Sequence, residues 1–253
     1  MLSTITRLKV PNVILRYIMM NFLDIKSIET LLLTVQQMNV LNSYSKDLLM
    51  KAKKGFMWNC ENGHLDVAKW LFSLGSVNIH AGDESAFRLS CGKGHIDVAK
   101  WLVSLGDVNI HVDDEYAFCM SCENGHMDVA KWLFSLGDID IHADDEYAFR
   151  KSCENGHMDV AKWLISFGGV DIHADDEYAF RMSCENGHMD VAKWLVSFGG
   201  VNIHADNEGA FRWSCKNGHM DVAKWLFSLG ANIPKNIYCG NDDIREWINS
   251  LKN

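Results

Sequence analysis

The chain of 253 residues has only two prolines, Pro11 and Pro234, and no long run of apolar residues. Proline ends helices because it lacks a backbone N–H and clashes with the preceding turn, so the chain between these two positions contains no such helix breaker. The longest candidate membrane segment, Val13–Leu23, contains Arg16 and Asn21 and is too short to span a bilayer. The chain also does not open with the charged and apolar regions of a secretory signal.

Positive charge is also scarce, because 24 Lys and Arg face 33 Asp and Glu and give a formal net charge of −9. Residues 1–50 carry +2, so the remainder carries −11. An acidic surface repels phosphate, and nucleic acid is therefore not expected as a partner. Apolar residues make up 48% of the chain, which is typical of a soluble folded protein.

The chain does contain one segment that occurs six times with a period of 31 residues. It is clearest at Cys184–Trp194, which reads Cys-Glu-Asn-Gly-His-Met-Asp-Val-Ala-Lys-Trp. Near copies begin at Cys60, Cys91, Cys122, Cys153 and Cys215. A fixed period of this size is typical of a stacked repeat array. Six of the eight cysteines occupy this one position, so we interpret them as small buried residues in a reducing compartment and not as a disulfide framework.

Each unit predicts two short helices. In the copy that starts near residue 175, the first is expected near Glu177–Glu185, with Asp175 or Asp176 as its N-cap. Its apolar face is formed by Ala179, Phe180, Ser183 and Cys184. The second is expected near Asp190–Phe198, capped by Asp190 or by the preceding turn. Its apolar residues are Val191, Ala192, Trp194 and Leu195. Helices of about ten residues are marginal alone, so the units must stack, which predicts an all-α solenoid.

The Gly-His turn, the Asp-Val-Ala-Lys-Trp-Leu helix and the Gly-x-x-x-Ile-x-Ala connector resemble the ankyrin repeat. The family's Thr-Pro-Leu-His is replaced by Tyr178-Ala-Phe-Arg181, and the unit is 31 residues long where the family has about 33. The resemblance implies six helix-turn-helix repeats over residues 51–233 and a capping half-repeat over 234–253. It also implies non-catalytic protein binding. The low divergence of the copies resembles that of repeat arrays in giant viruses of amoebae.

Residues 1–50 do not share the period and are predicted to be helical. Within residues 9–40 the pattern resembles a degenerate F-box, in which Val10 and Ser27 replace the usual Leu and Asp. The residues that carry this resemblance are Pro11, Ile14, Leu15, Ile18, Leu23 and Ile28. It implies docking on a Skp-type linker subunit of a cullin–RING ubiquitin ligase. The alternative is an apolar helical cap on the first repeat, and the two interpretations are not exclusive.

No repeated residue pattern predicts a metal, a cofactor or a reaction. Cys-x-x-x-His recurs in every unit, but one unit offers two ligands where zinc needs four, so we interpret the cysteine as core filler and the histidine as a turn residue. No nucleophile–base pair or phosphate-binding loop is visible, and no enzymatic activity is expected.

A second histidine series lies in the connectors and is expected to bond the next turn: His80, His111, His142, His173 and His204. If these residues titrate together near pH 6, the array is sensitive to acid. The tryptophans and phenylalanines at the repeat period are predicted to form the core. Trp163→Ala is accordingly expected to destabilise the array by about 3–5 kcal/mol.

The resemblance implies that partners meet the hairpin tips and the exposed side of the first helices. In this chain those positions are Asp113, Asp114, Tyr116, Asp144, Asp145, Tyr147, Arg150, Lys151, Asp175, Asp176, Tyr178, Arg181, Arg212 and Trp213. The alternative is that the acids only cap helices and keep this face hydrated. We therefore predict a protein-interaction scaffold in a reducing, intracellular compartment, namely the cytoplasm, or the host cytoplasm if the source is viral. An F-box-type adaptor and a passive structural array remain alternatives.

Overall fold

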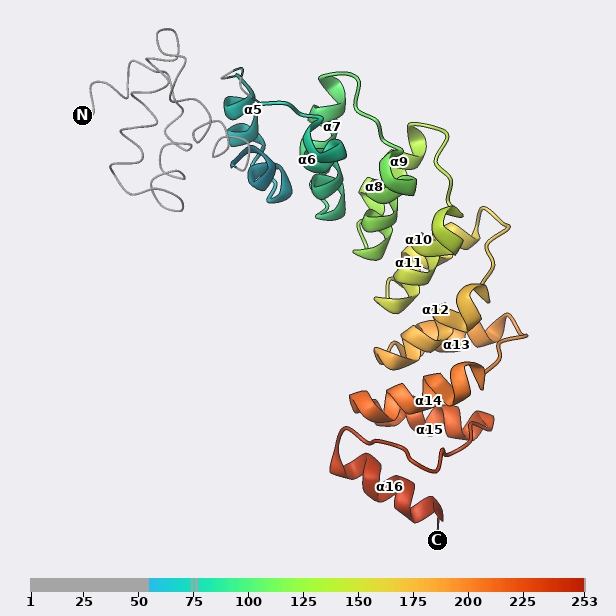
Figure 1. Ribbon diagram of the computed structural model, residues 1–253. Helices are drawn as coiled ribbons and strands as arrows, with labels where there is room; N and C mark the ends of the chain where they lie inside the picture. Colours follow the sequence, from blue (N-terminus) through green and yellow to red (C-terminus); the bar gives the residue numbers. More distant parts are fainter. Residues whose placement is uncertain (1–54, 74, 76, 253) are drawn as a thin grey trace, which may run out of the picture. The chain divides into compact units, whose positions relative to one another are not determined.

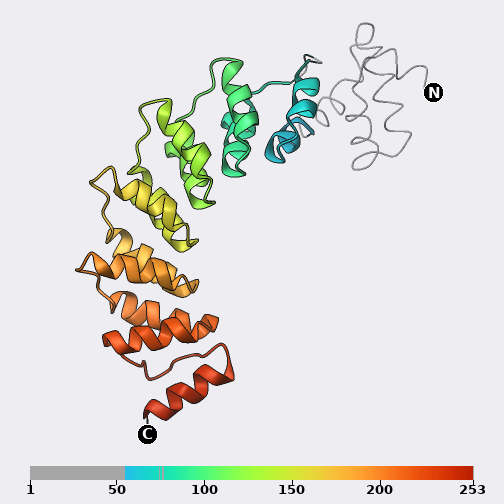
Figure 2. The ribbon, with the colours of Figure 1, turned by 180° about the vertical axis from the view of Figure 1, so that it is seen from behind.

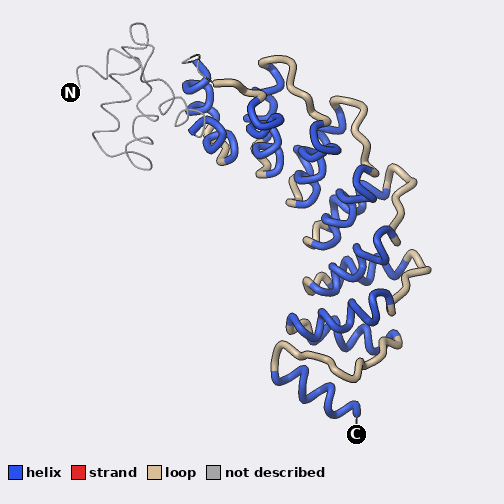
Figure 3. The backbone as a smooth tube through the Cα atoms, in the orientation of Figure 1, coloured by secondary structure: helices blue, strands red, loops and turns tan. Residues whose placement is uncertain are grey.

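The computed structural model describes residues 55–73, 75 and 77–252, and in this part of the chain every regular element is a helix (Figures 1 and 3). The F-box-like segment and the alternative cap, both predicted within residues 1–50, lie outside the described residues. The described chain divides into two compact units. The first holds residues up to Ser90 together with His95–Val108, and the second holds Cys91–Gly94 together with the chain from Asn109.

In the first unit, a helix over residues 55–61 is followed by α5 (Leu65–Ser73), most of α6 (Ala81–Gly92) and α7 (Ile96–Ser104). The core of this unit joins consecutive repeats through aromatic rings. The Phe56 and Trp101 ring centroids lie 6.2 Å apart, and those of Phe72 and Trp101 lie 5.9 Å apart.

In the second unit, first and second helices alternate along the chain (Figure 2). The elements are α8 (Val112–Glu123), α9 (Met127–Ser135), α10 (Ala143–Glu154), α11 (Met158–Ile165), α12 (Ala174–Glu185), α13 (Met189–Ser197), α14 (Ala205–Asn217), α15 (Met220–Leu229) and α16 (Asp242–Lys252). Each first helix from α8 to α14 packs on its own second helix, and α8, α10 and α12 also pack on the first helix of the next repeat. This arrangement confirms the predicted all-α stack of helix-turn-helix units.

The start of each first helix differs from the prediction. Asp175, Asp176 and Glu177 have φ values of 54°, 53° and 62°, so they form a left-handed turn that precedes regular helix. The N-cap residue of α12 is His173, whose side chain makes no cap hydrogen bond, and the predicted capping role of the aspartates is wrong. Left-handed backbone is uncommon for residues with a Cβ, although aspartate tolerates it better than most. Asp190 is not a cap either, because α13 is capped by His188 and already includes Asp190.

One phenylalanine per repeat occupies the centre of the core, as predicted. Its side chain is at most 1% exposed in every copy. The six residues are Phe56, Phe87, Phe118, Phe149, Phe180 and Phe211. The six repeated cysteines are fully buried and all eight cysteines are free thiols, which confirms their interpretation as packing residues.

The tryptophan column is only half-buried, which corrects its prediction as core. Within the second unit the indoles pack on the phenylalanine of the preceding repeat, with centroid distances of 6.2 Å for Phe118–Trp163 and 6.4 Å for Phe149–Trp194. An exposed lysine of the preceding second helix lies on the same ring, and Lys131 Nζ is 5.9 Å from the Trp163 centroid. The tryptophan therefore covers the core from the outside, while the phenylalanine fills its centre.

Neighbouring repeats also share hydrogen bonds at the C-terminal ends of the first helices. The buried Ser152 hydroxyl donates to the carbonyl oxygen of Cys122 at 3.2 Å, and the Asn155 side-chain amide donates to that of Glu123 at 3.0 Å. The last carbonyl groups of a helix have no partner within the helix itself. The repeat that contains α10 thus caps α8 of the repeat before it.

The Gly-His turn makes a second contact between repeats. Gly156 has a φ of 76°, and a Cβ placed there would lie 2.6 Å from Nδ1 of His188 in the next repeat. Only glycine satisfies both the left-handed backbone and the close approach of the ring. The predicted role of this histidine series in the turn is confirmed, since His188 is the N-cap residue of α13.

The segment after α15 replaces a first helix with extended chain. The Gly240 N–H donates to the Cys215 carbonyl oxygen at 2.9 Å, where an inner repeat would place a serine hydroxyl. Ile244 and Ile248 of α16 are buried, and Trp247 lies 6.4 Å from Phe211 between ring centroids. The last helix therefore covers the core with the residue types of a second helix.

Candidate functional site

The predicted partner-binding residues all lie in the second unit, on the first helices α8, α10, α12 and α14 and on the left-handed turns that open them. We call this set of residues the first-helix surface. The tip aspartates are exposed, and Tyr116 is 37% exposed. Tyr147, Tyr178, Lys151, Arg181 and Trp213 are half-buried.

Tyrosines on the first-helix surface are held by glutamates of the preceding repeat. The Tyr147 hydroxyl donates to Glu123 Oε2 at 2.7 Å, and the Tyr178 hydroxyl donates to Glu154 Oε2 at 2.7 Å. Burial and the hydrogen bond to Glu123 raise the pKa of Tyr147 well above its ordinary range. The phenol groups therefore stay protonated and present fixed aromatic faces.

Lys151 joins the same network. Its Nζ lies 2.6 Å from Glu154 Oε2 and 2.7 Å from the Tyr178 hydroxyl oxygen. Burial opposes the ammonium charge, but the hydrogen bonds to Glu154 and Tyr178 outweigh it and raise the pKa of Lys151. The lysine is charged at neutral pH, and its charge is already matched inside the surface.

Arg150 supports the left-handed turn of its own repeat. Its Nε donates to the Asp145 carbonyl oxygen at 2.6 Å and its Nη2 to that of Asp144 at 3.0 Å. A third bond from Nη1 reaches Asp175 Oδ2 of the next repeat at 2.8 Å. The side chain is buried, so Arg150 lies beneath the first-helix surface and does not project from it as predicted.

Arg181 and Arg212 repeat this pattern with more exposure. Arg181 Nε donates to the Asp176 carbonyl oxygen at 2.7 Å, and its Nη1 lies 3.3 Å from Asp206 Oδ2. Arg212 donates to the carbonyl oxygens of Asp206 and Asn207. The arginines therefore satisfy backbone groups that the left-handed turns leave outside the helices.

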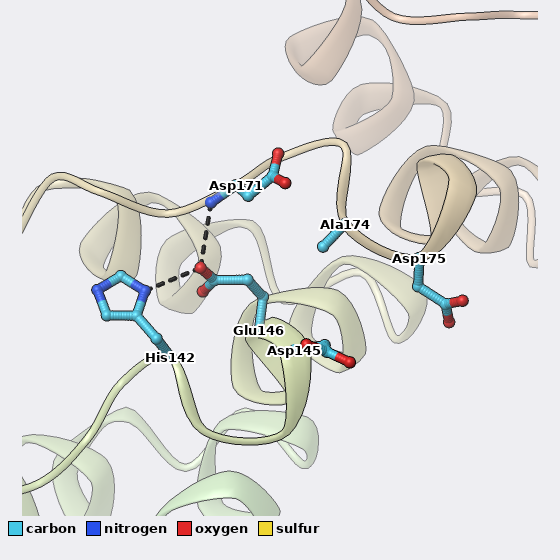
Figure 4. A pocket seen from close by; sticks show the side chains of 6 residues that line it. All are labelled: His142, Asp145, Glu146, Asp171, Ala174 and Asp175. Atoms are coloured by element: carbon cyan, nitrogen blue, oxygen red, sulfur yellow. Dashed lines mark hydrogen bonds and ion pairs between the residues drawn. The ribbon is translucent and has the colours of Figure 1, made fainter.

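A buried glutamate, which was not among the residues predicted from the sequence, lies next to each connector histidine. Nδ1 of His142 lies 2.8 Å from Oε1 of Glu146, which also accepts the Asp171 N–H at 3.1 Å (Figure 4). The histidine thus bonds a glutamate of its own repeat, and that glutamate holds the connector of the next repeat. The spacing His-x-x-x-Glu, which occurs five times, was the signal, and the left-handed turn between the two residues brings their side chains together.

A hollow of about 390 Å³ opens beside this pair (Figure 4). Its lining consists of His142, Asp145, Glu146, Asp171, Ala174 and Asp175. Four of these six residues are acidic, and two of them, Asp145 and Asp175, are predicted partner-binding residues. The hollow is suited to cationic groups and unsuited to anions.

The described residues include no group of three or more His, Cys, Asp or Glu side chains placed to bind a metal ion. Burial raises the pKa of Cys60 to about 12, so this thiol is not a thiolate at neutral pH. In the part of the chain that the structure describes, no helix has the length and apolar character needed to cross a membrane.

Comparison with protein families agrees with this geometry. Residues 56–145 and 149–237 match the family model described as ankyrin repeats (3 copies), and these stretches make up more than half of the chain. A comparison with curated proteins finds no match. Stacked helix pairs joined by Gly-His turns, together with the match to the family model, show that the chain belongs to the ankyrin-repeat family.

Proposed function

We propose that the chain is a non-catalytic scaffold that binds a protein partner on the first-helix surface. Ankyrin repeats are generally protein-interaction modules. The observation that carries the proposal is the row of exposed aspartate pairs, one pair on each left-handed turn of α8, α10 and α12. These aspartates do not cap helices, and two of them, Asp145 and Asp175, line an acidic hollow. A basic segment of a partner fits such a row by charge and is steered toward it.

The proposal is tested by removing charge without changing the backbone. Asp145→Asn with Asp176→Asn places at both turns the residue that Asn207 already provides in the last repeat. The matched control is Asp159→Asn with Asp190→Asn, which removes the same charge from exposed positions of α11 and α13. The full chain is cross-linked to the proteins that it captures, and mass spectrometry identifies the cross-linked residues. We expect these residues to lie on first helices. Capture should fall with the turn variant only, and equal loss with both variants would refute the proposal.

An F-box-type adaptor is the second candidate, supported by the pattern from Pro11 to Ile28. In this version the N-terminal segment docks on a Skp-type linker while the repeats hold the target. The test is binding of the full chain to a purified Skp-type protein, with Leu15→Ser and Ile18→Ser as the disabled variant. Equal binding by both proteins, or none by either, leaves the helical cap as the interpretation of residues 1–50.

A passive structural array is the third candidate. It is favoured by the near identity of the copies, which resembles that of giant-virus arrays and is typical of recent duplication. This candidate predicts no protein cross-linked to first helices in the experiment above. For either binding candidate we expect a reducing compartment such as the cytoplasm, because all eight cysteines are free thiols.

A further inference from the structure

The last repeat carries a second hollow, of about 280 Å³, whose chemistry is opposite to that of the acidic one. Three residues of α14 and three of the segment that follows α15 line it: Arg212, Trp213, Lys216, Asn236, Ile237 and Tyr238. Two of these residues are cations and none is acidic. We call it the C-terminal hollow.

Comparison of the copies shows that this chemistry is specific to the last repeat. Lys216 occupies the position that holds a glutamate in the three preceding repeats, namely Glu123, Glu154 and Glu185. Trp213 replaces Met182, and Gly209 replaces the tyrosine that would otherwise bond Glu185. Among near-identical copies, α14 thus differs by a lysine in place of a glutamate and by one additional indole, and both changes line the C-terminal hollow.

The cations of the C-terminal hollow are not matched by acids. Lys216 Nζ lies 4.1 Å from the Trp213 ring centroid, and the Arg212 guanidinium carbon lies 5.8 Å from it. The hydrogen bonds of Arg212 go to backbone carbonyl groups, and within the described chain neither cation has a carboxylate within ion-pair distance. Tyr238 is 70% exposed and adds a second aromatic face.

We propose that the C-terminal hollow binds a short acidic peptide segment of the protein partner. Lys216 and Arg212 take a carboxylate of this segment, and an adjacent apolar side chain packs on Trp213 and Tyr238. The inference rests on the proposed function, because it gives the chemistry of the partner at one end of the same surface. A basic stretch of the partner lies over the tip aspartates and an acidic stretch of the partner lies at the C-terminal hollow. Together they fix the direction in which the partner chain runs along the first-helix surface.

The test uses the full chain labelled with fluorotryptophan and observed by fluorine NMR. Trp213→Met, which restores the residue found at Met182, assigns the Trp213 resonance. The probe is the acetylated and amidated peptide Glu-Glu-Leu-Glu. We expect the Trp213 resonance to shift saturably with this peptide and not with the matching Lys-Lys-Leu-Lys peptide. Lys216→Glu should weaken binding about tenfold, because it replaces attraction with repulsion.

Lys216→Glu is expected to fold, since Glu185 occupies the same position one repeat earlier. Lys193→Glu on the exposed side of α13 is the matched control and should leave the peptide affinity unchanged. A Trp213 resonance that does not shift, or that shifts equally in Lys216→Glu, overturns the inference. The inference is also overturned if inorganic phosphate or a single-stranded oligonucleotide saturates the Trp213 shift at a lower concentration than the acidic peptide does. Because this test uses a peptide and the test of the proposed function uses the tip aspartates, the two can fail separately.

Discussion

At the scale of single residues, the tightest constraint lies where a glycine of one repeat meets a histidine of the next. The same approach occurs five times, with a distance of 2.5–2.6 Å between a hypothetical Cβ and the histidine Nδ1. Sequence comparison of the copies predicted a turn here. It did not predict that the ring belongs to the following repeat, because spacing along the chain does not say which turn faces which.

Gly156→Ala should destabilise the array more than Gly168→Ala. Both glycines have a left-handed φ, 76° and 80°, so each substitution carries a backbone cost of about 1–2 kcal/mol. Only at Gly156 does the added methyl group also meet His188, whereas nothing lies within 4 Å at Gly168. Urea unfolding followed by circular dichroism measures both variants. Equal losses of stability would show that the ring does not lie against the glycine.

Acid should destabilise the fold through His188. Burial lowers the pKa of His188 below its ordinary value of 6.5, against the opposing effect of the Asp190 carboxylate, and the nearby His157 and His219 lower it further. As the pH falls below the ordinary value of 6.5, the histidine of the unfolded chain binds a proton more readily than that of the folded chain. The free energy of unfolding therefore falls as the pH decreases. The sequence alone predicts acid sensitivity from the connector histidines, and each of these lies beside a glutamate.

The measurement is the urea midpoint at about pH 7.5 and about pH 5.5, above the range in which ordinary carboxylates titrate. The His188→Asn variant should show a smaller decrease between these two values than the unchanged chain. The comparison reports the contribution of His188 together with its coupling to His157 and His219. The same decrease in both proteins would contradict the assignment.

At the scale of helices, each element is completed by its neighbour. The first helices α8 and α12 receive C-terminal caps from a serine and an asparagine of the next repeat, and α10 receives one from an asparagine. The second helix α13 covers the phenylalanine of the preceding repeat through Trp194. The helix bounds were predictable to within three residues, because the spacing of apolar residues and the Gly-His turns between helices are local signals. The left-handed turn was not predictable in this way. In α10 the Arg150 guanidinium holds the turn's carbonyl groups from five and six residues further along the chain, whereas in α8 the same turn forms with Cys119 at the equivalent position.

Phe149→Ala should cost more stability than Trp163→Ala, which reverses the emphasis of the sequence-based expectation. Phe149 is fully buried, and its truncation is expected to cost about 3–5 kcal/mol. Trp163 is half-buried, so its truncation removes less apolar contact and should cost about 1.5–3 kcal/mol. Urea unfolding of the two variants under one set of conditions measures the difference. A larger loss for Trp163→Ala would mean that the indole, and not the phenyl ring, is the centre of the core.

At the scale of the whole molecule, the candidate site is less predictable than the fold. The tip aspartates were identified from the family resemblance, but their acidic hollow depends on Asp171, which comes from the connector of the next repeat. The C-terminal hollow depends on Tyr238, which lies outside the periodic part of the sequence. Contacts of this kind arise from stacking and have no signature within a single copy.

Removal of one complete period should leave a folded protein. Deletion of residues 143–173 joins His142 to Ala174 and recreates the His-Ala junction that both repeats already have. We expect the helical signal per residue to be retained and the melting temperature to fall, because one interface between repeats is lost. The control is deletion of residues 143–167, which breaks the period and should abolish cooperative unfolding. Loss of folding in the first deletion would show that the copies are not interchangeable.

The bond from Gly240 to the Cys215 carbonyl oxygen has a consequence for how such a chain can grow. A Cβ at Gly240 would lie 2.0 Å from the Lys216 carbonyl oxygen, so this position admits glycine and no residue with a side chain. A first helix that followed α15 directly would need the same Cys215 carbonyl oxygen for its serine hydroxyl. A copy inserted at this point would therefore have to displace the segment around Gly240.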